Sequence, residues 1–547
     1  MRSVQEPSRD GEVRRASGGA SLLRRSLPGR WQITAVTAVV LVACSLLWLG
    51  LAQGAGRGNP GPTQLGSVAT STISVSPNDG ISAEWDAVER VDVVVYGATS
   101  SGLGALRGLR LAAERLTGPV RVVLVSNTAA LESPLAQGLC LEDDYEPGTL
   151  GGFYREFRQT MLEHYEALGV WPLERNGRMV YEPEVAQAVL ERLAFTDEQV
   201  PEGARGRVEM LRLWGVLRGA SDAEGDRYVI VQDEAGSRLR LETTYFIDAS
   251  VEADLARALG CTYTIGRSPL RQNDLRGRQA VPPTRTNLYT TSPQSLTLLV
   301  TLKVAAEGIA EAVESHELWR DPAPEPALPA KVPRNIASTF EGSWSMRHVL
   351  PGDKRELNEA WSDCPDPDLS YSWYMEPENR PLILARLQQR ALTQVAAIQD
   401  AFPQIGVARL PTWPYVRGEI MVLSENVFGL AQLESNQEDP ISCGKYAAFD
   451  RHDTINGAQQ PDTAAMVMLP LRAVQPVDHP YLLVSSAYSV DWKAYNSALR
   501  MEPVRANAGA ACGALIALAL AEGSALGEVE YHMLSEELLA QGHVLIR

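Results

Sequence analysis

The sequence predicts an α/β fold that follows a single membrane-spanning helix. The apolar run from Val91 to Tyr96 is typical of a parallel strand buried on both faces, and a second such run spans Val120 to Val125. Apolar residues at helical spacing lie between them, from Gly102 to Arg115. Strands that alternate with helices indicate a parallel sheet covered by helices. Further upstream, an uncharged run from Ile33 to Ala52 is long enough to cross a bilayer.

Length, charge and cysteine spacing restrict the classes of protein to consider. A chain of 547 residues has room for two or more domains. Its formal net charge of -17 argues against a nucleic-acid partner, because phosphate binding requires clustered Lys and Arg. The 6 cysteines include no Cys-x-x-Cys pair, so their spacing predicts neither a zinc site nor a disulfide framework. We therefore expect no metal site and no nucleic acid.

The N-terminal segments predict an anchor and a tether. Residues 1–30 are basic, without apolar periodicity, and are expected to be disordered. Residues 31–53 form the expected transmembrane anchor, and the arginines before it keep the N-terminus cytoplasmic and the C-terminal domain extracytoplasmic. Two alternatives remain open: a cleaved signal peptide that yields a secreted protein, and a lipoprotein linked through Cys44 of the sequence LVAC. Residues 54–88, rich in Gly, Pro, Ser and Thr, are expected to be a flexible linker.

The strand, turn and helix from Val91 onward form a Rossmann-like unit, a typical nucleotide-binding arrangement. The turn reads GATSSG, in which Gly97 allows the tight bend and Gly102 allows close packing of helix and strand. Thr99 stands where the usual fingerprint has its middle glycine. Ser100 and Ser101 could add hydroxyl donors at the helix N-terminus, where pyrophosphate normally binds. Spacing excludes a P-loop, which requires a lysine directly after the second glycine.

The acid that usually binds the ribose is missing from the second strand. Ser126, followed by Asn127, occupies the place of that acid. A hydroxyl can bind ribose, but without charge assistance each hydrogen bond is about half as strong. We therefore expect a cofactor to be held largely by other segments.

Two later segments also predict ligand contacts. A strand ends in Asp248, Ala249 and Ser250 directly before a short helix, and ligands of open α/β sheets lie at the carboxyl ends of strands. The C-terminal region contains a small-residue helix, in which Gly509 and Gly513 would allow close approach to a flat ligand.

Several blocks, in the same order along the chain, resemble the FAD-dependent oxidoreductase family. The turn GATSSG is similar to the family's GGTPAG turn, and the segment FIDASVEADL is similar to its FIDATYEGDL segment. The RMEP sequence with the helix after it resembles the family's closing block. The resemblance covers most of Val91 to Gly523. It implies FAD as cofactor and hydride transfer to the flavin from a small-molecule substrate, such as a carbohydrate-related alcohol. The electron acceptor that reoxidises the flavin is not indicated by the sequence.

The resemblance also implies a domain organisation. Residues 89–266 would form the first part of a discontinuous FAD-binding domain, and residues 476–547 its C-terminal part. Residues 267–475 would form an inserted α+β substrate or cap region. The start of the helix after the RMEP sequence would face the flavin.

The chain departs from the family in the loop LESPLAQGL. Glu132 and Ser133 stand where the family has paired glycines, although Gly138 is retained and is expected to contact the cofactor. Glu132 brings bulk and negative charge towards an anionic ligand. A second hypothesis is therefore a degenerate member that keeps the fold as a non-catalytic binding or scaffold module. A nicotinamide enzyme is a third option, disfavoured by the C-terminal block.

Four residues are candidates for the chemistry. The family-like segment with the pattern Tyr-x-x-x-Asp-x-His contains Tyr446, Asp450 and His452. His452 is the expected base, because histidine titrates in the useful pH range. A purely structural polar cluster is the alternative. Arg500 would bind an anionic substrate or the flavin edge, or would instead pair with Glu502.

Overall fold

The computed structural model describes residues 85–142, 147–174, 177–266, 293–306, 308–319, 324–446, 451–453, 457–459, 466–477 and 479–545. The chain divides into two units, Met1–Thr72 and Ile73–Arg547, and every described residue belongs to the second. The basic N-terminus and the expected transmembrane anchor lie outside the described residues. The expected linker does so up to residue 84, and strand β1 (Ala87–Arg90) begins within its last part.

A five-stranded sheet, parallel throughout, confirms the predicted α/β fold. The strand order is β18 (Leu482–Val484), β8 (Tyr245–Asp248), β2 (Val93–Tyr96), β3 (Val120–Ser126) and β4 (Val208–Trp214). Strands β2 and β8 are fully buried, which explains their apolar sequences. This order brings β18, from the C-terminal region, next to β8, so the sheet is assembled from distant parts of the chain.

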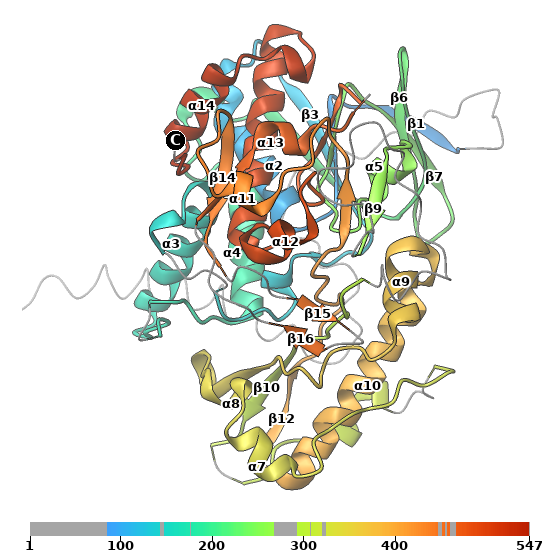
Figure 1. Ribbon diagram of the computed structural model, residues 1–547, viewed down its shortest axis with the longest axis vertical. Helices are drawn as coiled ribbons and strands as arrows, with labels where there is room; N and C mark the ends of the chain where they lie inside the picture. Colours follow the sequence, from blue (N-terminus) through green and yellow to red (C-terminus); the bar gives the residue numbers. More distant parts are fainter. Residues whose placement is uncertain are drawn as a thin grey trace, which may run out of the picture. The chain divides into compact units, whose positions relative to one another are not determined.

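Two helices pack against each other through their backbones: α2 (Ser100–Leu111) and α13 (Glu502–Glu522), which run side by side in Figure 1. Gly104 and Gly108 of α2, with Gly509 and Gly513 of α13, form the contact. A Cβ atom at any of these four positions would lie 1.9–2.2 Å from a backbone oxygen of the other helix. Among the described residues, α13 is the helix long and apolar enough to span a membrane, and 89% of its apolar window is buried in the fold.

Other elements surround this core. Helices α3 (Gly152–Ala167), α4 (Pro183–Phe195) and α14 (Tyr531–Ala540) pack on the α2–α13 pair, and α5 (Asp254–Ala258) follows β8. A second sheet has the order β1, β7 (Arg238–Glu242), β6 (Asp226–Gln232) and β5 (Val216–Ala223). The two-stranded pairs are β9 (Tyr263–Ile265) with β13 (Ile420–Val422), β14 (Pro440–Gly444) with β17 (Val467–Pro470), and β15 (Arg451–Asp453) with β16 (Gly457–Gln459).

The inserted region has its own hydrophobic core. Its antiparallel sheet has the order β11 (Lys354–Leu357), β10 (Val300–Val304) and β12 (Ile405–Arg409), packed against the long helix α10 (Arg380–Ala401). The shorter helices are α7 (Ile336–Glu341), α8 (Trp344–Arg347), α9 (Pro367–Met375), α11 (Leu430–Leu433) and, beyond this region, α12 (Trp492–Ala494). Not all of residues 267–475 belongs to this separate core, because β14 packs directly against α13.

Candidate functional site

The glycine turn is packed against the bend that follows β8. Gly97 has a φ of 103°, and a Cβ atom there would lie 2.7 Å from the backbone nitrogen of Ser250. Thr99 is the N-cap of α2: its Oγ1 accepts a hydrogen bond from the N–H of Gly102 at 3.2 Å. The same hydroxyl donates to the carbonyl oxygen of Ala249 at 2.8 Å. The turn and the bend are therefore packed directly against each other.

The bend is held by the carboxylate of Asp248. It accepts hydrogen bonds from the N–H of Ser250 at 2.9 Å, from the Ser250 hydroxyl at 2.6 Å and from the N–H of Ala256 at 2.8 Å. Burial raises the pKa of Asp248 to about 7, against the effect of these donors. The side chains of Asp248 and Ser250 are thus occupied with each other, and the bend meets the turn through the backbone of Ala249.

The start of α13 meets the same turn. The Ser100 hydroxyl donates to the carboxylate of Glu502, and the Ser101 hydroxyl contacts the Ser485 hydroxyl at 2.7 Å. The turn, the bend and the start of α13 therefore converge. The serine hydroxyls are bonded to protein, but among the described residues the N–H groups of Ser100 and Ser101 have no backbone acceptor, as expected at a helix N-terminus. Such donors suit a phosphate.

Glu132 occupies the corner between the turn and the end of β3. One carboxylate oxygen accepts from the N–H of Asn127 at 2.5 Å, and the other accepts from the N–H of Ala98 at 3.2 Å. Burial, together with the nearby Glu252, raises the pKa of Glu132 to about 7. Ser126, the residue expected at this corner, instead donates its hydroxyl to the carbonyl of Thr128 at 2.7 Å.

Three of the expected cofactor-binding glycines contact protein backbone. Gly138 has a φ of 114°, and a Cβ atom there would lie 2.1 Å from the carbonyl oxygen of Leu299. Gly509 and Gly513 meet the backbone of α2 in the same close manner. The packing of α13 on α2, rather than the approach of a flat ligand, explains these last two glycines.

The groups at the turn fit the ADP half of FAD. The N-terminus of α2 provides donors for phosphate, and Glu132 provides a carboxylate at the end of β3. One further buried polar atom, Oγ of Ser133, has no partner among the described residues. Unpaired buried polar atoms are costly, and a polar ligand would satisfy them.

A second polar cluster surrounds His452. Its Nδ1 lies 2.8 Å from a carboxylate oxygen of Asp363. Arg417 reaches the other oxygen of Asp363 at 3.4 Å and donates to the hydroxyl of Thr297 at 2.7 Å. Burial opposes ionisation of Asp363, but Arg417 and His452 outweigh it and hold its pKa below the usual value. We call His452, Asp363 and Arg417 the cap cluster.

A chain of buried side chains links the cap cluster to the glycine turn. Arg505 donates to the carbonyl of Arg417 at 2.6 Å and to a carboxylate oxygen of Glu502 at 3.1 Å. Glu502 in turn accepts from Ser100 at the turn. Arg500 donates to the hydroxyl of Tyr415 at 3.0 Å, and the guanidinium of Arg417 lies 4.8 Å from the centre of the Tyr415 ring. One network therefore joins the two parts of the site.

The structure locates the remaining chemical candidates. Tyr446 follows β14 and belongs to the main hydrophobic core, whereas Asp450 lies outside the described residues. Asp363 holds the Nδ1 of His452, and Arg505 pairs with Glu502. Sequence reasoning missed Asp363, Arg417, Tyr415 and Arg505, because no motif spacing connects these positions.

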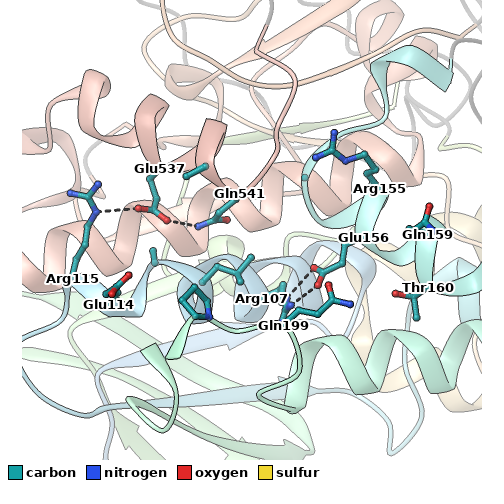
Figure 2. A pocket seen from close by; sticks show the side chains of 15 residues that line it. Arg107, Glu114, Arg115, Arg155, Glu156, Gln159, Thr160, Gln199, Glu537 and Gln541 are labelled. Atoms are coloured by element: carbon teal, nitrogen blue, oxygen red, sulfur yellow. Dashed lines mark hydrogen bonds and ion pairs between the residues drawn. The ribbon is translucent and has the colours of Figure 1, made fainter. Parts of the chain in front are cut away.

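A cavity of about 750 Å³ lies away from the glycine turn. It is lined by the C-terminal part of α2 with residues of α3 and α14 (Figure 2). Four of its charged side chains form two ion pairs: Arg107 with Glu156, and Arg115 with Glu537, the latter at 3.1 Å. The candidate site described above does not use this cavity.

Comparison with known proteins identifies the family. Residues 92–538 match the model of the family described as FAD dependent oxidoreductase. No curated protein matches the sequence. Solved structures with some similarity include the myxobacterial chondrochloren halogenase CndH, with 11% identity over 82% of this chain and 78% of that chain and a TM-score of 0.33.

Two other similar structures are quinol fumarate reductase FrdA from E. coli and the aromatic hydroxylase CabE from angucycline biosynthesis. FrdA has 11% identity over 83% of this chain and 74% of that chain, with a TM-score of 0.30. CabE has 16% identity over 41% of this chain, with a TM-score of 0.24. The chain spans 39% of the length of CabE.

Proposed function

The chain belongs to the FAD-dependent oxidoreductase family, and we propose that it removes a hydride from a small-molecule substrate and transfers it to FAD. The N–H groups of Ser100 and Ser101 would hold the pyrophosphate, and the start of α13 would hold the flavin edge. When bound, FAD supplies the hydride acceptor. The protein supplies orientation and the group that moves a proton.

The observation that carries the catalytic part of this proposal is the 2.8 Å contact between His452 and Asp363. A carboxylate on Nδ1 fixes the orientation of the ring and leaves Nε2 as the nitrogen that would face the substrate. His452 would accept the hydroxyl proton of an alcohol at Nε2 as the hydride leaves the adjacent carbon. Arg417 and Arg500 would hold a developing or permanent negative charge on the substrate.

The absorbance spectrum of the purified protein tests the cofactor, and anaerobic bleaching by a panel of alcohols tests the reaction. His452→Gln is expected to keep the flavin spectrum and to slow bleaching by about 10²- to 10⁴-fold, the usual contribution of a general base. His316→Gln, remote in sequence and half-buried, is the matched control. Colourless protein that takes up no added FAD would overturn the proposal.

We further propose that the folded part is tethered outside the cytoplasmic membrane by residues 31–53. The uncharged run and the arginines before it support this placement. The full chain is expected in the membrane fraction after a carbonate wash, and deletion of residues 1–53 is expected to release it. Loss of anchoring in Cys44→Ser would instead favour a lipoprotein.

The second candidate function is a non-catalytic binding or scaffold module. The burial of Thr99, Ser100 and Ser101, each with its hydroxyl bonded to protein, favours it. If Glu132 blocks the turn, the triple change Ser126→Glu, Glu132→Gly and Ser133→Gly should confer FAD uptake on a protein that otherwise lacks it. Bleaching of a bound flavin by a substrate in the unmodified protein would exclude this candidate.

A further inference from the structure

We propose that Glu132 is the ribose-binding residue of this protein and replaces the acid that is missing from the end of β3. The inference rests on the proposed function, because it assumes that FAD binds at the glycine turn. It assigns a binding role to a residue that interrupts the glycine pattern of the family-like loop.

The position of Glu132 is fixed by contacts on both sides of the expected ribose site. Its backbone N–H donates to the carbonyl of Ala98 at 2.9 Å, and its carboxylate accepts from the N–H of the same residue. The other carboxylate oxygen accepts from the N–H of Asn127, the first residue after β3. A side chain that starts in the following loop therefore reaches the corner where a strand-end acid would lie.

The end of β3 does not provide an acid of its own. The Ser126 side chain is buried, and its hydroxyl donates to the carbonyl of Thr128. Asn127 accepts from the hydroxyl of Tyr96 at 2.9 Å through its side-chain oxygen. Glu132 is thus the carboxylate that contacts both the turn and the strand end.

Glu132 has unused capacity for hydrogen bonds. An ionised carboxylate can accept about four; among the described residues each oxygen of Glu132 has one backbone N–H donor, and the side chain of Asn127 is a further hydrogen-bond partner. Within the same part of the chain, Glu132 forms no ion pair, although Arg380 is close enough to favour its charged form. In the described part of the chain, Oγ of Ser133, the residue after Glu132, has no hydrogen-bond partner. Hydrogen bonds from the ribose hydroxyls would use the remaining acceptor capacity of the carboxylate.

The charged groups around Glu132 predict how binding depends on pH. Glu252 and burial oppose its ionisation and Arg380 favours it, and the nearby Tyr96 stays neutral because burial raises its pKa. The ionised carboxylate accepts both ribose hydroxyls, whereas a protonated one offers less acceptor capacity. FAD should therefore bind more tightly as the pH rises through about 7, the pKa of Glu132.

The test measures binding rather than turnover. FAD and an analogue that lacks the adenosine 2′-hydroxyl are titrated into the flavin-free full chain, with quenching of flavin fluorescence as the signal. Glu132→Gln is expected to weaken FAD binding about 10- to 100-fold, as for loss of charge-assisted hydrogen bonds, and to weaken binding of the analogue much less. Glu209→Gln, an exposed substitution on β4, is the matched control and should change FAD affinity less than about twofold.

Two further outcomes decide between the roles of Glu132. Equal weakening of both ligands would overturn the proposal in favour of structural support for the turn, and unchanged or tighter FAD binding by Glu132→Gln would overturn it in favour of an obstruction. Partial recovery of FAD affinity in the double variant Ser126→Glu, Glu132→Gln would support it. If the unmodified protein binds FAD tightly but no substrate bleaches it, the proposed reaction fails while the role of Glu132 stands.

Discussion

The glycine turn and the cap cluster, the two parts of the candidate site, are held together by different kinds of contact. At the glycine turn, most contacts have a backbone group on at least one side, as between Gly97 and the backbone of Ser250 and between the Thr99 hydroxyl and the carbonyl of Ala249. At the cap cluster, contacts involve charged side chains from separate segments. Contacts of the backbone require a particular conformation of the turn, and residues close together in the sequence determine that conformation. A side-chain cluster requires correct assembly of the whole fold.

The buried carboxylates of the two parts show this difference most clearly. Asp363 contacts Arg417 and His452, and its pKa is lowered. Glu132 contacts backbone N–H groups without a counter-ion in contact among the described residues, and its pKa is raised to about 7. The contributions of these two carboxylates to the free energy of unfolding therefore change with pH in opposite directions.

The largest expected effect comes from the backbone contact that supports the glycine turn. A Cβ atom at Gly513 would lie 1.9 Å from the carbonyl oxygen of Ala105, and neither helix can move without opening the core. Gly513→Leu is expected to prevent native folding, and even Gly513→Ala should cost about 3 kcal/mol, as for other overpacked cores. Urea unfolding followed by circular dichroism measures both.

Gly118→Ala is the control for this prediction, because a Cβ atom at Gly118 meets nothing within 4 Å. It should change the unfolding free energy by less than about 0.5 kcal/mol. Similar stability of the Gly513 and Gly118 variants would contradict the close packing of α2 and α13.

The next effect concerns the cap cluster. Asp363→Ala leaves the guanidinium of Arg417, whose side chain is 2% exposed, without its carboxylate. Removing one partner of a buried ion pair typically costs about 3–5 kcal/mol. We expect a loss of about that size in the free energy of unfolding at pH 7, and a much smaller one for Arg386→Ala, a partly exposed arginine on α10.

The pH dependence of this effect has a defined sign. Because the pKa of Asp363 is lower in the folded chain than in the unfolded chain, its contribution is present above the unfolded pKa of about 4. That contribution is lost as the pH falls through the folded pKa. Asp363→Asn should therefore reduce the loss of stability in acid. An acid limb identical to that of the unmodified protein would contradict the pairing.

Glu132 should produce the opposite profile. Its pKa rises from about 4 in the unfolded chain to about 7 in the folded chain, so the folded state binds the proton more tightly. The stability that this proton confers is present below pH 4 and is lost as the pH rises towards 7. Glu132→Gln is therefore expected to gain stability over the unmodified flavin-free protein, by roughly 2–3 kcal/mol at pH 8 relative to pH 4.

Thermal unfolding across this pH range, with FAD absent, measures the effect. Glu209→Gln, an exposed substitution on β4, controls for the change in net charge. A constant difference between Glu132→Gln and the unmodified protein from pH 4 to pH 8 would show that the pKa of Glu132 is the same in the folded and unfolded chains, contrary to its raised pKa.

The sequence predicted correctly those features that depend on residues close together in the chain. The apolar runs, the glycine turn and the RMEP block indicated the α/β fold and the FAD family, and both are confirmed. The sequence predicts ligand contacts for the bend at Asp248 and for the start of α13, and both segments contact the turn through Thr99 and Ser100. Local conformation and strand order determine these contacts, and both leave a pattern in the sequence.

Prediction failed where partners come from distant segments. Asp363 and Arg417 lie 54 positions apart and share no motif, and the packing of the whole inserted region brings them together. The contacts of Glu132 could not be predicted either, because its position in the sequence departs from the family pattern and indicates only added bulk and charge. Its side chain reaches the turn only because the loop folds back onto Ala98. The three-dimensional path of the loop, rather than the position of Glu132 in the sequence pattern, determines which groups its carboxylate contacts.

The smallest expected effect explains why a threonine occupies the position of the middle glycine. Thr99 caps α2 and also donates to Ala249, so one hydroxyl stabilises the helix start and joins the turn to the bend. Thr99→Ala should cost about 1 kcal/mol, the usual value for loss of an N-cap. Thr99→Ser retains the hydroxyl and should cost only a few tenths. Equal losses in the two variants, measured by urea unfolding, would assign the effect to the threonine methyl group. In that case, packing of the Thr99 methyl group would stabilise the turn more than hydrogen bonding by its hydroxyl does. The turn would then depend on side-chain contacts, as the cap cluster does.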